Sequence, residues 1–162
     1  MCSSRAASDV PGTHGRADRP DPPGCAGGSD EDRRMTRTDG RCPCGGGDYA
    51  TCCRPFHEGA PAPTAEALMR SRYSAFALGL GPHLRDTWST ATRPADLDLD
   101  DGLEWRRLQI VDTVRGGADD DEGVVEFRAA HRSAEGAGVL HERSRFARED
   151  GRWVYVDGDL LA

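Results

Sequence analysis

The sequence predicts an α+β fold in which helices come first and an antiparallel sheet follows. Apolar residues recur at helical spacing over 64–80, and from residue 103 onward they alternate with polar residues in runs separated by short turns. Helices that precede a run of strands, rather than alternating with them, are typical of α+β architecture. The 162 residues are enough for about one domain with a small appendage.

Residues 1–40 form an N-terminal extension that we expect to be disordered. Val10 is its one sizeable aliphatic residue, it has no aromatic residue, and Gly, Pro, Ser, Asp and Arg dominate it. Such a segment cannot bury enough apolar surface to offset its chain entropy. A regulatory tail is one interpretation. The other is that translation starts at Met35, which would discard Cys2 and Cys25.

The overall composition excludes several classes of partner. The net charge is -7, so bulk attraction to nucleic acid or anionic lipid is not expected. All 21 basic residues are arginine, which indicates GC-rich codon usage. No apolar run approaches the roughly 18 residues of a membrane span, and no secretory signal is visible. We therefore expect a cytoplasmic protein without a membrane partner, encoded with the GC-rich codon usage of some bacteria.

Four of the six cysteines lie within twelve residues, as the pairs Cys42/Cys44 and Cys52/Cys53. Zinc prefers four such ligands at the corners of a tetrahedron. Three glycines at 45–47 allow the tight turn that would bring the two pairs together. The spacing favours a structural zinc ion, which would fold a segment that has no core of its own.

Two alternatives to zinc stay open for these cysteines. The first is a disulfide pair, and the second is a redox or catalytic role for one thiol. His57 is a reserve ligand, in case the adjacent Cys52 and Cys53 do not both reach the metal.

Two helices are expected after the cysteine segment. Thr64 can cap the first helix, and Gly79 can end it. A shorter second helix over 82–89 begins at a proline. The loop over 93–102 is acidic, but it lacks the glycine and the terminal glutamate of an EF-hand, so we interpret it as solvated.

Four strands are expected to follow as an antiparallel meander. They run over 103–114, 124–132, 139–148 and 152–156. Alternation along the third strand places His141, Arg143 and Arg145 on one face, and Glu142, Ser144 and Phe146 on the other.

Charged and aromatic residues of both expected helices and the later strands form a candidate pocket. Its residues are Arg70, Arg72, Tyr73, Trp88, Glu142, Arg143, Arg145 and Asp157. An enzyme would use Glu142 or Asp157 as a general base and an arginine to hold an anionic substrate. The same charges also suit structural ion pairs between strands. No nucleophile, base and orienting group occur together, so we favour ion pairing over ligand binding, and assign no catalytic residue.

Four separated segments resemble a known family. The run from Cys42 to Cys53 resembles the SEC-C zinc motif, known from the C-terminal tail of the SecA translocation motor and from the start of YchJ family proteins. Residues 68–76, 141–146 and 151–158 resemble further YchJ signatures. The resemblance covers about 42–160. In this chain the loop between the cysteine pairs is one residue shorter than usual, and glycine replaces a serine at position 46.

The resemblance implies both a fold and a set of ligands. Zinc would bind Cys42, Cys44, Cys52 and Cys53 in a knuckle over 41–57. Residues 64–162 would form a nuclear-transport-factor-2-like (cystatin-like) roll, in which a curved sheet wraps the helices around a conical pocket.

The leading functional hypothesis is a non-enzymatic module that docks a protein partner through the knuckle. It rests on the resemblance to the SecA tail, because one fold can host unrelated functions. A small-molecule-binding or enzymatic roll, with purely structural zinc, is the first alternative. Single-stranded nucleic-acid binding is the second, and it is disfavoured because the knuckle offers only Arg41 and Arg54 as basic residues beside Tyr49 and Phe56.

Overall fold

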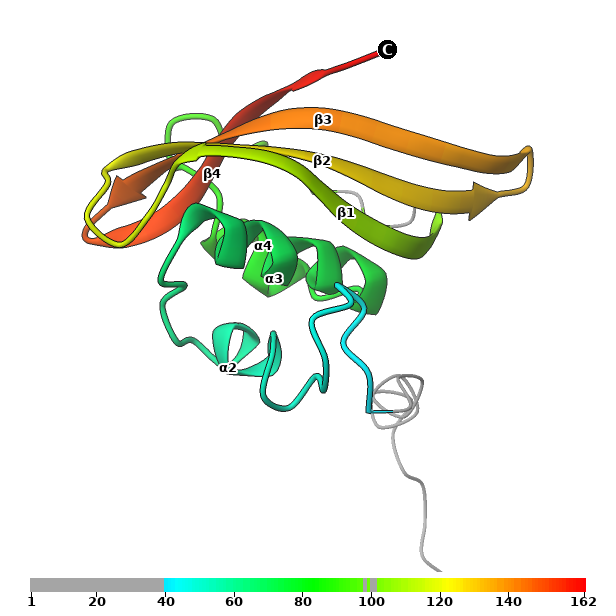
Figure 1. The fold of residues 1–162 in the computed structure, drawn as a ribbon, viewed down its shortest axis with the longest axis horizontal. Coiled ribbons are helices and arrows are strands. Elements are labelled where there is room, and N and C mark those ends of the chain that lie inside the picture. The colour runs from blue at the N-terminus through cyan, green and yellow to red at the C-terminus, as the bar shows by residue number, and fades with distance from the viewer. Residues whose placement is uncertain (1–39, 98, 100–101) are drawn as a thin grey trace, which may run out of the picture.

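The computed structural model describes residues 40–97, 99 and 102–162. A curved four-stranded antiparallel sheet covers one side of a long helix, and the cysteine segment lies on the other side of that helix (Figure 1). The extension over 1–39, the start at Met35, and three aspartates of the acidic loop lie outside the described residues.

The elements follow the predicted order. The helices are α2 (Arg54–His57), α3 (Ala65–Leu78) and α4 (Gly81–Asp86), and the strands are β1 (Glu104–Arg115), β2 (Glu122–Ser133), β3 (Gly136–Glu149) and β4 (Arg152–Leu160). The strands pair in sequence order, each antiparallel to the next. The α+β prediction is therefore confirmed. The single turn α2 was not predicted.

Helix α3 begins and ends where its capping residues predict. The Thr64 side chain accepts a hydrogen bond from the Ala67 amide at 3.1 Å, which satisfies one of the free donors of the first turn. Gly79 adopts the left-handed conformation with φ 70°, and the Leu80 amide donates to the Ala75 carbonyl at 2.8 Å. Both ends are therefore closed by local chemistry that the sequence contains.

Helix α4 is shorter than the predicted 82–89, because β4 captures the residues that follow it. The Tyr155 amide donates to the Thr87 carbonyl at 2.8 Å, and the Ser89 amide donates to the Tyr155 carbonyl at 2.7 Å. These bonds form a parallel bridge between Trp88 and Tyr155. A long-range backbone pairing thus replaces the last helical turn.

Strand β4 is longer than the predicted 152–156 and continues to Leu160. The extra residues, which include Gly158, pair with β3 beyond a bulge between Arg145 and Phe146. Asp157 and Asp159 both bond the Arg145 side chain across the strands. Cross-strand charge pairing therefore accompanies the continuation of β4 beyond its predicted end.

The N-terminus of α3 is held against the turn between β1 and β2 by two glycines. The Ala65 amide donates to the Gly116 carbonyl at 2.9 Å. A Cβ atom on Gly123 would lie 2.5 Å from the Gly116 Cα and 3.2 Å from the Ala65 Cβ. Because real Cβ contacts are longer than this, the strand and the helix can approach so closely only where residue 123 has no side chain.

Gly123→Ala is therefore expected to destabilise the fold by about 1–3 kcal/mol, because backbone atoms would have to move to admit the methyl group. The free energy of unfolding from urea titration measures this change. Gly117→Ala, in the same turn, is the matched control, because its Cβ would have an ordinary 3.4 Å contact with Asp120. Equal stabilities for the two variants would contradict the packing argument.

Candidate metal centre

Four cysteine sulfur atoms converge beside α3. All four Sγ atoms lie within 4.8 Å of one another. Four of the separations are 3.4 Å for Cys42–Cys44, 3.5 Å for Cys44–Cys52, 3.6 Å for Cys44–Cys53 and 3.8 Å for Cys52–Cys53. A tetrahedral site with Zn–S bonds near 2.3 Å has edges of about 3.8 Å, whereas a disulfide bond needs about 2.05 Å. The donor set therefore fits a metal ion, and all four cysteines are free thiols.

Backbone hydrogen bonds hold the short loop between the two cysteine pairs. The Cys42 amide donates to the Gly47 carbonyl at 2.7 Å, and the Cys52 amide donates to the Asp48 carbonyl at 2.9 Å. A Cβ atom on Gly46 would lie 2.8 Å from the Cys52 Sγ. Glycine at position 46 therefore leaves room for the sulfur atoms in this shortened loop.

The pKa values of three of the four thiols are shifted, and not all in the same direction. Hydrogen bonding to Cys42 and Cys53 lowers the pKa of the Cys44 thiol. Burial, followed by the hydrogen bond to Cys44, raises the pKa of Cys52 to about 12. Hydrogen bonds to Cys42 and Cys44, followed by burial, raise the pKa of Cys53. Cys44 therefore loses its proton more readily than Cys52 and Cys53 do, and a bound cation would displace the protons of its thiol ligands.

Helix α3 supplies the groups that surround the sulfur atoms. The fully buried Ser74 places its Oγ 3.4 Å from the Sγ of both Cys42 and Cys53. Arg70 donates to the Cys44 carbonyl at 3.4 Å and pairs with Glu66 at 2.8 Å. Arg70, which the sequence grouped with the pocket, thus lies at the cysteine segment.

His57 joins the cysteine segment to α3 and lies outside the group of sulfur atoms. Its Nε2 donates to the Ser71 carbonyl at 2.8 Å, because a carbonyl can only accept. Its Nδ1 then accepts from the Tyr49 hydroxyl at 2.8 Å. Both ring nitrogens are engaged, so His57 is not placed to act as the reserve ligand.

A cavity of about 300 Å³ lies between α3 and the concave face of the sheet. Of the predicted pocket residues, it brings together Arg72, Tyr73, Trp88 and Glu142. Its other lining residues are mostly apolar and come from α3 and all four strands or their ends.

The remaining pocket candidates lie on the outer face of the sheet, which corrects their assignment. Arg145 pairs with Asp157 at 2.5 Å, and Arg143 pairs with Glu126 at 3.0 Å. The physical reason is the period of two: Arg143 and Arg145 point away from the face that carries Glu142. These ion pairs form across neighbouring strands.

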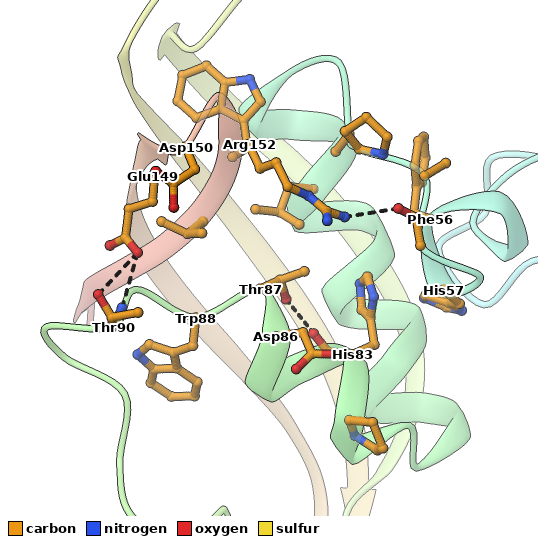
Figure 2. Close-up of a pocket in the computed structure, with 18 of the residues that line it drawn as sticks. Phe56, His57, His83, Asp86, Thr87, Trp88, Thr90, Glu149, Asp150 and Arg152 are labelled. Carbon is orange, nitrogen blue, oxygen red and sulfur yellow. Dashed lines mark hydrogen bonds between the residues drawn. The ribbon is translucent and has the colours of Figure 1, made fainter.

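A second hollow, of about 420 Å³, was not predicted (Figure 2). It lies between the chain after α2, helix α4 and the turn between β3 and β4. His83 Nε2 bonds the Ser71 Oγ at 3.1 Å, and Arg152 donates to the Gly59 carbonyl at 2.9 Å. Burial, followed by the nearby His57, lowers the pKa of His83 to about 3. The contacts that form this hollow join distant segments, and no local pattern signals them.

Known proteins are similar to this chain both in sequence and in architecture. A family model described as "YchJ, middle NTF2-like domain" matches residues 64–158. A UPF0225 protein of Streptomyces coelicolor is 56% identical over 122 residues, which cover 74% of this chain and 95% of that protein. A UPF0225 protein of Corynebacterium efficiens is 55% identical over 122 residues, which cover 74% and 93%.

Two solved structures are also similar. The solution structure of a SEC-C motif containing protein from Rhodopseudomonas palustris has a TM-score of 0.66 and 31% identity, and covers 75% of this chain and 99% of that one. The crystal structure of a SEC-C motif containing protein from Psychrobacter arcticus has a TM-score of 0.59 and 28% identity, and covers 71% and 73%. None of the helices in the described part of the chain is long and apolar enough to cross a membrane.

His83 is expected to make the stability of the fold depend on pH. Its pKa in the folded protein, about 3, lies below the ordinary value of 6.5, so the unfolded chain binds a proton first as the pH falls. The contribution of His83 to the free energy of unfolding is therefore fully present above about pH 6.5 and is lost progressively as the pH falls toward 3. We expect a loss on the order of 1–2 kcal/mol from this residue between pH 7 and pH 5.

Urea titrations at pH 7 and pH 5, on the natural protein and on His83→Gln, measure this contribution as a difference between the two proteins. Because the cysteine segment is the same in both, any effect of acid on the thiols cancels. An identical pH dependence in the two proteins would show that His83 is not held neutral in the fold.

Proposed function

The chain belongs to the YchJ (UPF0225) family of SEC-C motif proteins. We propose that its four clustered cysteines bind one structural zinc ion. The observation that carries the proposal is the spacing of the sulfur atoms. Separations of 3.4–3.8 Å are close to the edges of a zinc–thiolate tetrahedron.

The surroundings of the sulfur atoms support a structural rather than a catalytic role. Cys42, Cys44 and Cys53 are buried, and Cys52 is half-buried. Four thiolate ligands complete a tetrahedron and leave no position for a substrate or a water molecule. When bound, zinc would supply a link between the two cysteine pairs, and the residues of α3 would hold that link in place.

We further propose that the segment fixed in this way, residues 41–57, docks a protein partner. One side of the segment packs on α3 through Ser74 and Ser71. The other side is exposed: it includes the glycines at 45–47 together with Ala50 and Thr51. A loop held by a metal and by backbone bonds loses little entropy on binding, which favours recognition through a small surface.

Cys42→Ser and Cys53→Ser are each expected to abolish metal binding. Each variant leaves three thiolates and one serine hydroxyl, and this ligand set binds zinc much more weakly than four thiolates. Native mass spectrometry of protein purified from cells should show a mass excess of one zinc ion for the natural protein and none for either variant. Cys25→Ser, a cysteine outside the 41–57 segment, is the control and should keep the ion. Unchanged metal content in both variants would refute the site.

The docking role is tested with a variant that keeps the metal. Thr51→Trp places a large side chain on the exposed loop and should abolish the recovery of partners in a cross-linking pull-down, while zinc content stays at one. Val139→Trp, at an exposed position on the far face of the sheet, should recover the same partners as the natural protein. If Thr51→Trp recovers them as well, the loop is not the docking surface.

A further inference from the structure

We propose that the cavity inside the roll binds a small molecule that has an apolar body and a carboxylate head. Nothing in this proposal depends on zinc, because the cavity lies on the opposite side of α3 from the cysteines. The proposal rests on the contents of the cavity: apolar walls at one end, and at the other a buried arginine outside any ion pair beside an indole N–H without a partner.

The apolar end suits a compact hydrophobic or aromatic group. Its walls are formed by Met69, Tyr73, Phe76, Trp105, Phe127 and Leu140. Ligand cavities are mostly apolar, with volumes of about 300–1,000 Å³. At about 300 Å³, this cavity admits a small molecule, and burial of an apolar body there is favourable.

The polar end contains a buried positive charge. Arg72 is 3% exposed, and none of the ion pairs formed by the described residues involves it. Its hydrogen bonds there, both 2.8 Å long, come from Nη1 and go to the Leu84 carbonyl and the Thr87 hydroxyl. The guanidinium carbon lies 5.0 Å from the centre of the Trp88 ring and 4.7 Å from that of Tyr155.

Arg72 remains charged at neutral pH. Burial lowers its pKa to about 10, which is still well above 7. The guanidinium is held by two ring faces, one carbonyl and one hydroxyl, and Glu142 acts on it through its charge without forming an ion pair with it. Arg72 thus lacks the direct anionic partner that a buried charge normally has. A carboxylate in the cavity would supply that partner, and Arg72 would still have Nε and Nη2 to donate to it.

The neighbouring groups favour a hydrogen-bond acceptor over a donor. Trp88 also lines the cavity, and its Nε1 is buried without a partner. Glu142 is the acidic residue of the lining, but its Oε1 already accepts from the Ser144 hydroxyl at 2.6 Å and the Tyr155 hydroxyl at 3.2 Å. The buried Trp88 Nε1 is therefore a donor without a partner, and together with the guanidinium of Arg72 it favours a ligand group that accepts.

Phenylacetate and phenylacetamide test the proposal, because they have nearly the same shape and differ in charge. We expect phenylacetate to bind at least about tenfold more tightly, since a charge-assisted hydrogen bond is about twice as strong as a neutral one. Indole N–H signals in ¹H–¹⁵N NMR spectra of the full chain report both affinity and place. The signals of Trp88 and Trp105 should move, whereas that of Trp153 should not, because it donates to the Pro63 carbonyl outside the cavity.

Two variants locate the binding site. Leu140→Phe fills the apolar end and should abolish binding, whereas Val139→Phe, next to it on the opposite face of β3, should not change it. Arg72→Met should remove the preference for the carboxylate. If Arg72→Met does not fold, the comparison of the two probes and the Leu140→Phe variant still decide. The proposal is overturned if neither probe moves the cavity tryptophans, if the two probes bind equally, or if Leu140→Phe binds as well as Val139→Phe.

Discussion

Close packing on two sides of α3 is the constraint on which the rest of the structure depends. The helix is buried almost all round, so its small residues decide how near its neighbours can come. Ala65, Ser71, Ser74 and Ala75 are all fully buried. Ala65 touches the turn of the sheet, the Ser74 side chain faces the cysteine segment, and the Ser71 side chain faces His83 of α4. Larger side chains at these positions would separate the two parts of the protein.

The cysteine segment and the roll consequently share one core. Cys42, Cys44 and Cys53 belong to the same buried cluster as Leu68, Phe127 and Phe146. The expectation that a metal alone would fold this segment was too simple, because it also packs against α3. Buried thiols that bond Ser74 bring polar atoms into an otherwise apolar cluster, and buried polar groups are tolerated only when they have partners. The proposed metal ion and the Ser74 hydroxyl of α3 would thus together give the buried sulfur atoms their partners.

Local chemistry predicted much of this fold, and long-range contacts account for what it did not. Thr64 and Gly79 mark the ends of α3 because capping uses neighbouring residues. The four sulfur atoms are close together because the cysteines are close in sequence. In contrast, the bonds of Thr87 and Ser89 to Tyr155 join residues more than sixty positions apart. The outer position of Arg145 follows from strand alternation, but its pairing with Asp159 depends on a bulge that the sequence does not signal.

Arg72 connects α3 with α4 and β4. A solvated arginine at this helical position would contribute little, and a buried one loses hydration that the protein must replace. Its guanidinium replaces part of this hydration with the Leu84 carbonyl, the Thr87 hydroxyl and the faces of the Trp88 and Tyr155 rings. Trp88 lines both the inner cavity and the second hollow beside His83. One side chain therefore fixes α4 on α3, anchors the wall between the two hollows, and sets the positive charge at the polar end of the cavity.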